Sequence, residues 1–102
     1  MIRIKGFITE VSQTRDWTDR NGEQRQSVNL VLVFPYVAKD GRELCDEMMG
    51  EMTLPKDKSL EGIRKACEDH EKCEIHVGFN LSDWNGKKIQ NIRVYNLTRL
   101  MM

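Results

Sequence analysis

Apolar and polar residues alternate in five short runs along this chain, and the alternation is interrupted once by a helical period. A period of two is typical of strands that turn one face to a core and the other to solvent. The clearest run is 27–34, and Pro35 is expected to end it because proline cannot donate to a strand ladder. The other expected strands are 2–11, with a possible bulge at Gly6, and 44–54, 74–81 and 89–97.

The helical period covers residues 57–70. Apolar and sulfur-bearing residues recur there at helical spacing, and charged residues occupy the other sides. Asp57 or Ser59 can cap the start by accepting an otherwise unpaired backbone N–H. The apolar stripe consists of Leu60, Ile63, Cys67 and His70, so we expect Cys67 to be a buried thiol.

Three strands, one helix and two strands is the element order of the OB-fold, a five-stranded Greek-key barrel that its helix plugs at one end. Short alternating strands joined by hairpins also favour a barrel or sandwich over a parallel sheet. An SH3-like barrel would lack a full helix at this point, and a ferredoxin-like fold would need a second one. We therefore predict an all-β fold with one helix, and the 102 residues as a single domain, 1–102.

The charges cancel in number but not in distribution. Sixteen basic and sixteen acidic residues give a formal net charge of zero. Residues 84–102 nevertheless hold four basic residues and no acid, whereas residues 40–51 hold five acids and one arginine. Because the local field matters more than the sum for binding, a basic face on a neutral protein is compatible with a polyanionic partner.

The remaining composition favours a cytoplasmic protein. Cys45, Cys67 and Cys73 form an odd set without a disulfide framework, which is typical of reduced thiols. No apolar run approaches the roughly 20 residues of a membrane span. The alternating N-terminus does not resemble a signal peptide.

Two tryptophans lie in similar polar loops, Trp17 within residues 16–22 and Trp84 within residues 83–88. Tryptophan usually occurs where apolar area can be buried, so its place in a polar loop needs a reason. Flat rings beside Arg or Lys suit stacking on unpaired bases while the cations contact phosphates. The alternative is that each ring folds back over its own hairpin.

The whole chain resembles small bacterial or phage OB-fold proteins of the single-stranded-DNA-binding type. The similarity lies in the opening Ile-Arg-Ile-Lys-Gly-Phe-Ile-Thr-Glu-Val (2–11), the Val-Asn-Leu-Val-Leu run (28–32) and the closing Trp-Asn-Gly-Lys-Lys-Ile-Gln-Asn-Ile-Arg-Val-Tyr (84–95). The resemblance implies sequence-tolerant binding of single-stranded DNA, or of RNA. The classical proteins carry a long tail with an acidic end that recruits partners. This sequence ends at Leu100-Met101-Met102, so we do not expect that role to transfer.

In OB-folds the ligand lies across the second and third strands, between the first-to-second and fourth-to-fifth hairpin loops. The two tryptophans fall in those loops and would close over a strand from opposite sides. The candidate nucleic-acid-binding residues are Arg15, Trp17, Arg20, Trp84, Lys87, Lys88, Arg93 and Tyr95.

We expect no metal, no cofactor and no enzyme activity. Cys67, His70, Cys73 and His76 recur every three residues, but on a strand Cys73 and His76 would point to opposite faces, which argues against one tetrahedral zinc site. The sequence has no glycine-rich phosphate loop, no nucleophile elbow and no paired carboxylates in a predicted cleft, and we expect no small-molecule substrate.

The competing hypothesis is an interaction module without nucleic-acid binding. Met48, Met49 and Met52, or an exposed strand edge, would then join the barrel to a second copy or to another protein. A homo-oligomer fits both hypotheses, because one barrel of this size offers only a short groove.

Overall fold

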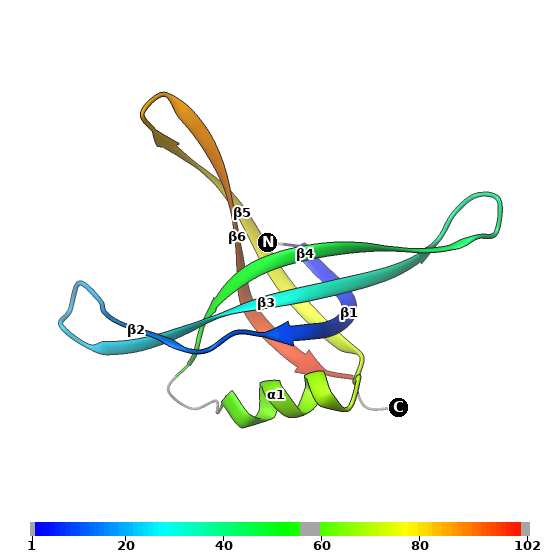
Figure 1. Cartoon of the computed structure of the whole chain (residues 1–102), viewed down its shortest axis with the longest axis horizontal. Coiled ribbons are helices and arrows are strands. Elements are labelled where there is room, and N and C mark those ends of the chain that lie inside the picture. Colours follow the sequence, from blue (N-terminus) through cyan, green and yellow to red (C-terminus); the bar gives the residue numbers. More distant parts are fainter. Residues whose placement is uncertain (1, 56–59, 101–102) are drawn as a thin grey trace.

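The computed structural model describes residues 2–55 and 60–100, and these residues form six strands and one helix (Figure 1). The elements are β1 (Ile2–Val11), β2 (Arg15–Thr18), β3 (Gln24–Val37), β4 (Glu43–Thr53), α1 (Leu60–Glu68), β5 (Cys73–Trp84) and β6 (Lys87–Arg99). The five predicted strands correspond to β1, β3, β4, β5 and β6. The four-residue β2 was not predicted, because its Arg-Asp-Trp-Thr sequence shows no apolar alternation.

Five of the strands close into a barrel. The sheet order is β1-β5-β6-β4-β3-β2, and β1 pairs with β3 as well, which joins the two ends of the five-stranded ring and leaves β2 outside it. The first half of β1 pairs with β5 and the second half with β3. β4 and β6 meet in parallel at Glu51 and Arg93. The predicted OB-fold is thus confirmed, with one additional strand.

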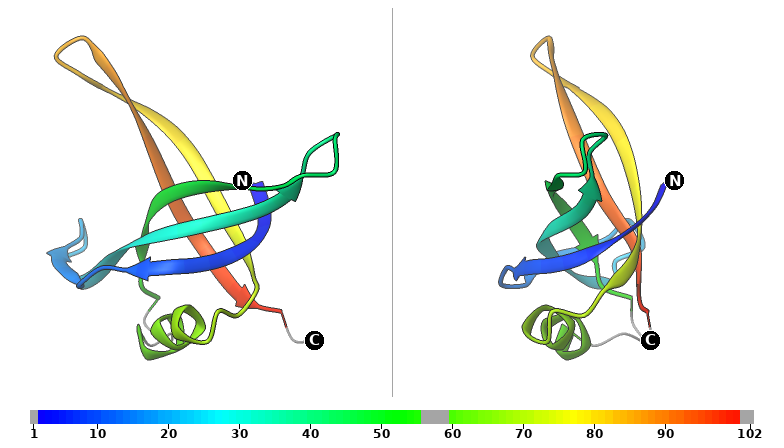
Figure 2. Two further views of the ribbon diagram at one scale, coloured as in Figure 1. Left: turned by 45° about the vertical axis from the view of Figure 1, so that its right-hand side comes forward. Right: turned by 90° about the vertical axis from the view of Figure 1, so that its right-hand side faces the viewer.

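The core follows from the alternation within the strands. In β3 the residues Val28, Leu30, Leu32 and Phe34 are buried, and Ile75 and Val77 of β5 point to the same interior. α1 covers one end of the barrel (Figure 2) with the buried side chains of Ile63 and Ala66. Cys67 is only partly buried, so Ala66 takes the core position that the sequence predicted for the thiol.

The helix ends before His70, contrary to the predicted stripe. His70 has a left-handed backbone (φ 51°), and its N–H bonds to the Cys67 carbonyl at 3.2 Å. The next N–H, of Glu71, bonds to the Ala66 carbonyl at 3.0 Å. This pair of bonds is a Schellman cap, which satisfies the last helical carbonyls and places His70 on the surface. The predicted caps Asp57 and Ser59 lie outside the described residues.

β3 continues through Pro35, which the sequence predicted as its end. The bond from the Ala38 N–H to the Arg42 carbonyl (2.9 Å) fixes the alternation of the β3–β4 ladder, so the Pro35–Cys45 pair is one that exchanges no hydrogen bonds. The nitrogen of Pro35 therefore points away from β4. β1 pairs with β3 only as far as Val33, so the proline occupies an edge position where no donor is needed.

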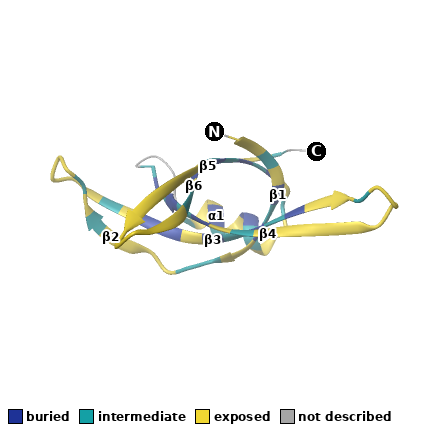
Figure 3. Cartoon of the chain, turned by 90° about the horizontal axis from the view of Figure 1, so that it is seen from above, coloured by how far each residue is buried: buried dark blue, intermediate teal, exposed yellow. Residues whose placement is uncertain are grey.

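The β3–β4 and β5–β6 hairpins extend beyond the barrel as arms (Figure 1), and the first of them is mostly exposed (Figure 3). We call residues 36–47 the β3–β4 arm and residues 79–92 the β5–β6 arm. Phe79 and Leu81 continue the apolar alternation of the expected strand 74–81, but they are 45% and 62% exposed. Their side chains point to the same side of β5 as Ile75 and Val77. They lie beyond the end of the barrel, so no other described strand covers them.

Gly6 marks a close crossing rather than the predicted bulge, and the register shift of β1 falls between Ile8 and Glu10. A Cβ at Gly6 would overlap the Val33 carbonyl oxygen and the Phe34 ring. We expect Gly6→Ala to lower the free energy of unfolding by about 1 to 3 kcal/mol, because backbone and a core ring would have to move. Urea unfolding measures this change.

Gly62→Ala is the matched control, because a Cβ there meets nothing within 4 Å. Alanine favours a helix by about 1 kcal/mol over glycine, so this variant is expected to gain stability. Equal losses in the two variants would contradict the assigned crossing.

Candidate functional site

The strand registers place one continuous set of polar and aromatic side chains on the outside of the barrel. Directly paired residues share a sheet face, and the neighbours of the buried Val28, Leu30, Met52 and Val94 point outward. Arg15 and Trp17 of β2 pair with Ser27 and Arg25 of β3, which extends this face beyond the barrel. We call it the outer face; its residues are Arg15, Trp17, Arg25, Ser27, Asn29, Met49, Glu51, Thr53, Arg93 and Tyr95.

The outer face is hollowed by two open depressions where β4 meets β6. One, of about 280 Å³, is lined by Arg25, Glu51, Thr53, Pro55, Arg93, Val94 and Tyr95. The other, of about 240 Å³, is lined by Asn29, Met49, Gly50, Glu51, Gln90, Asn91, Ile92 and Arg93. They adjoin, because Glu51 and Arg93 line both. Together they form a path across the strands, from β3 over β4 to β6.

This path is locally basic although the chain is neutral. Glu51 forms an ion pair with Arg15, in which Arg15 Nη2 lies 3.1 Å from Glu51 Oε2. Among residues 2–55 and 60–100, no carboxylate forms an ion pair with Arg25 or Arg93. Three guanidinium groups therefore face one carboxylate. An anionic ligand would find two arginines available there.

Trp84 lies at the tip of the β5–β6 arm. Asn85 and Gly86 have positive φ angles of 49° and 77°, as a two-residue type I′ turn requires, so Trp84 pairs directly with Lys87. The Trp84 ring is 67% exposed. The pairs Trp84–Lys87, Ser82–Ile89, Asn80–Asn91 and Gly78–Arg93 share one side of the ribbon. The outer face thus continues up the arm to Trp84.

Tyr95 is held across β5 by the absence of a side chain at Gly78. A Cβ at Gly78 would meet the Tyr95 ring. The ring is 54% exposed and borders the depression that contains Arg25 and Arg93. A flat aromatic surface beside two guanidinium groups can stack on an unpaired base while they contact the adjacent phosphates.

Trp17 is a sheet residue, not the loop-tip residue that the sequence predicted. Its Nε1–H donates to the Ser27 hydroxyl at 2.8 Å, and Ser27, which is 2% exposed, lies 3.3 Å from the Thr53 hydroxyl. These bonds fix the partly buried indole against β3. β2 and the tip of the β5–β6 arm also occupy separate ends of the outer face (Figures 1 and 2). The two rings therefore do not close over one channel.

The other predicted residues are divided between the outer face and its surroundings. Arg15, Arg93 and Tyr95 belong to the outer face, and Lys87 lies on its continuation. Arg20 is exposed in the turn between β2 and β3. Lys88 lies on the opposite side of the ribbon, where its Nζ is 3.4 Å from Asp83 Oδ1.

Arg25 and Asn29 were missed by sequence reasoning. Both alternate with the core residues of β3, so the period of two contained the information that they point outward. Their approach to Arg93 could not be predicted, because it depends on the parallel contact of β4 with β6 between distant parts of the chain.

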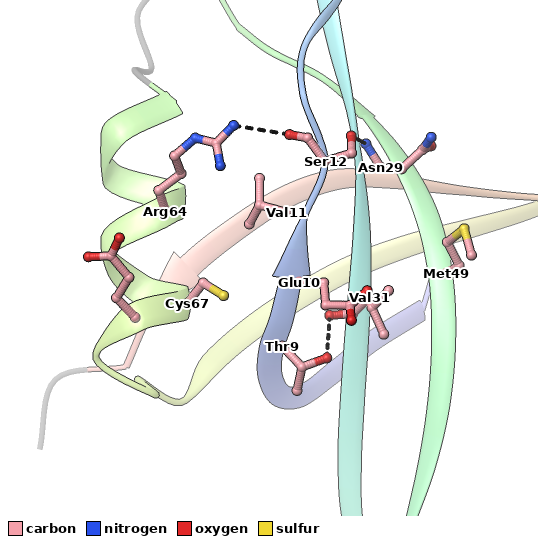
Figure 4. A pocket seen from close by; sticks show the side chains of 10 residues that line it. Thr9, Glu10, Val11, Ser12, Asn29, Val31, Met49, Arg64 and Cys67 are labelled. Carbon is pink, nitrogen blue, oxygen red and sulfur yellow. Dashed lines mark hydrogen bonds between the residues drawn. The ribbon is translucent and has the colours of Figure 1, made fainter.

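A larger groove of about 570 Å³ runs from α1 across β1 to Asn29, Val31 and Met49 of β3 and β4 (Figure 4). Arg64 spans it, its Nη2 donating to the Ser12 carbonyl at 3.1 Å. Glu10 and Glu68 also line the groove, so its carboxylates outnumber its one cation. Burial raises the pKa of the Cys67 thiol, and neighbouring Glu68 adds to the shift. A polyanion is disfavoured here.

The sulfur and imidazole groups are dispersed. Cys73 is buried in the core, where burial raises the pKa of its thiol. His76 lies on the other face of β5, as predicted, with Nε2 3.2 Å from Glu74 Oε1. Within the described ranges no three His, Cys, Asp or Glu side chains are placed to hold a metal ion. In the same residues, no helix has the length and apolar character to cross a membrane.

Comparison with known proteins bears on the fold. No protein-family model matches the sequence, and no curated protein matches it. One solved structure that this chain resembles is the Plasmodium falciparum SSB complex with ssDNA. The superposition has a TM-score of 0.53 at 9% sequence identity and covers 98% of this chain and 93% of that chain. At this identity the likeness supports the OB-fold.

Proposed function

We propose that this protein binds single-stranded DNA along the outer face, by stacking bases on Tyr95 and Trp84 and by pairing phosphates with Arg25, Arg93 and Lys87. The observation that carries the proposal is the juxtaposition of Arg25, Arg93 and Tyr95 around one open depression. The solved structure of the same fold holds ssDNA, which supports the same class of ligand.

The geometry favours a sequence-tolerant mode of binding. The depressions are open and expose a ring face and guanidinium groups, which every nucleotide can use. Each stacked base contributes about 1 to 3 kcal/mol, so two rings give modest affinity for one copy. A duplex hides its base faces, and we therefore expect it to bind more weakly than a single strand.

The salt dependence tests the proposed phosphate contacts. Three cations, Arg25, Arg93 and Lys87, are expected to release counterions from a single strand. The logarithm of the association constant should then fall against the logarithm of salt concentration with a slope of about −2. Fluorescence anisotropy of a labelled oligothymidine at increasing salt gives this slope, with labelled oligouridine and a duplex measured in parallel.

No anisotropy change at low salt and high micromolar protein would refute DNA binding by this chain. A slope near zero would refute the phosphate contacts, and equal affinity for the duplex would refute base stacking.

A second candidate function, self-association without a nucleic acid, is favoured by the exposed apolar residues on the inner sides of both arms. Sedimentation with and without oligothymidine separates the two functions, because a module of the second kind would sediment identically in both. The two functions are compatible, since they use opposite sides of the β5–β6 ribbon.

A further inference from the structure

Glu51 is a carboxylate on a face that is proposed to bind phosphates. Among the residues that define the outer face, only Glu51 is acidic. It lies where the two depressions adjoin, and its side chain is 35% exposed. A carboxylate at this position repels the phosphates of a bound strand. Its presence there is accounted for if it contacts a different part of the nucleotide.

The ion pair with Arg15 leaves Glu51 able to accept a further hydrogen bond. Arg15 Nη2 contacts Oε2 at 3.1 Å. Within residues 2–55 and 60–100, no other group forms a hydrogen bond or an ion pair with this carboxylate. Since an ionised carboxylate has about four acceptor positions on its two oxygens, Oε1 remains available to a ligand.

The depression that contains Arg25 and Arg93 has few side chains that can accept a hydrogen bond from a base. The two guanidinium groups can only donate. The hydroxyl of Thr53 lies 3.3 Å from that of Ser27, with which it shares a hydrogen bond. The carboxylate of Glu51 is therefore the acceptor that this depression offers to the edge of a base.

A base stacked on Tyr95 lies beside Glu51. Residues of β3, β4 and β6 and the adjoining Pro55 line the depression, so it opens on the β4 side of the ring. Glu51 is the register partner of Arg93, and Tyr95 follows two residues later on the same side of β6. Such diagonal neighbours are about 7 to 8 Å apart, a distance that the edge of a stacked base can bridge.

We propose, on the basis of the proposed DNA binding, that Glu51 accepts a hydrogen bond from the exocyclic amino group of the base on Tyr95 and so favours cytosine over thymine. Cytosine carries its N4 amino donor where thymine carries the O4 carbonyl. The carboxylate accepts from the amino group and is repelled by the carbonyl oxygen. Both purines also carry an amino group, so thymine is the disfavoured base. This preference adds to contacts that every nucleotide can make.

Anisotropy titrations with labelled oligodeoxycytidine and oligothymidine of equal length, at neutral pH, measure the preference. Both bases are pyrimidines, so ring size and stacking area are matched, and oligodeoxyuridine controls for the methyl group of thymine. The wild-type chain is expected to bind oligodeoxycytidine about fivefold more tightly than either of the other strands, as one additional exposed hydrogen bond implies.

Glu51→Gln tests the assigned acceptor, with Glu47→Gln as its control. The amide of Gln can donate to the thymine carbonyl as readily as it accepts from the cytosine amino group, so Glu51→Gln is expected to bind both strands equally. Glu47 is exposed on the same side of β4 but lines neither depression. Glu47→Gln makes the same charge change and is expected to keep the preference. Circular dichroism checks that both variants are folded.

Three results would overturn the role of Glu51: equal affinities of the wild-type chain for the pyrimidine strands, a cytosine preference that survives in Glu51→Gln, or an equal loss of preference in Glu47→Gln. Each of them leaves DNA binding in place, because binding of oligothymidine is measured in the same titrations. If no strand binds, the proposed DNA binding fails and the base preference fails with it.

Discussion

The double variant Arg25→Ala/Arg93→Ala is expected to bind oligothymidine about one hundredfold more weakly than the wild-type chain. Both guanidinium groups border the same depression, and a hydrogen bond to a charged group contributes about 1.5 to 3 kcal/mol. The slope of log association constant against log salt concentration should also become shallower by about 1.4, because two counterion-releasing contacts with the single strand are lost. Anisotropy titrations at several salt concentrations measure both quantities.

Lys65→Ala/Lys72→Ala is the control for this experiment. It removes the same net charge from exposed positions in and just beyond α1, away from the outer face. Loss of affinity through the overall field of the protein would appear in both double variants, whereas loss at a site appears only in the arginine pair. Equal losses would place the DNA elsewhere.

The two tryptophans are expected to respond in opposite ways. Trp17→Ala should lower the free energy of unfolding by about 2 kcal/mol, because it removes partly buried ring area and the bond to Ser27. For a domain of this size that corresponds to a melting temperature lower by roughly 10 °C. Trp84→Ala should leave melting within about 0.5 kcal/mol of wild type, since the ring is exposed.

The affinities should show the reverse order. Trp84→Ala is expected to weaken oligothymidine binding roughly fivefold to one hundredfold, as loss of one stacked base implies. Trp17→Phe, which keeps an apolar ring at β2, should bind normally at temperatures where it is folded. If Trp84→Ala destabilises the barrel and retains full affinity, the roles assigned to the two rings are wrong.

The barrel could be predicted because the residue patterns that indicate its strands and helix each lie within one short segment of the sequence. Val28, Leu30, Leu32 and Phe34 alternate so regularly that the strand and its buried face follow directly, and the single helical period fixes the OB order. Pro35 misled the prediction because proline breaks a strand only where its nitrogen faces a partner. Whether it does so depends on how far β1 extends along β3, and no local pattern encodes this.

The candidate site was predictable in part. Trp84, Lys87, Arg93 and Tyr95 were found from the final hairpin, whose Asn-Gly turn and alternation fix their common side. Arg25 and Asn29 were missed since their relation to Arg93 is a long-range contact. Trp17 was assigned to a loop because β2 is too short to show a period, and its bond to Ser27 is a tertiary feature.

The position of bound DNA on the barrel tests the account most directly. Backbone amide chemical shifts of the isotopically labelled protein, followed during titration with oligothymidine, give this position residue by residue. Shifts are expected at Arg25, Asn29, Glu51, Arg93, Tyr95 and Trp84, with α1 and the β3–β4 arm unchanged. Shifts confined to α1 and residues 9–12, or no shifts at saturating oligothymidine, would contradict DNA binding along the outer face.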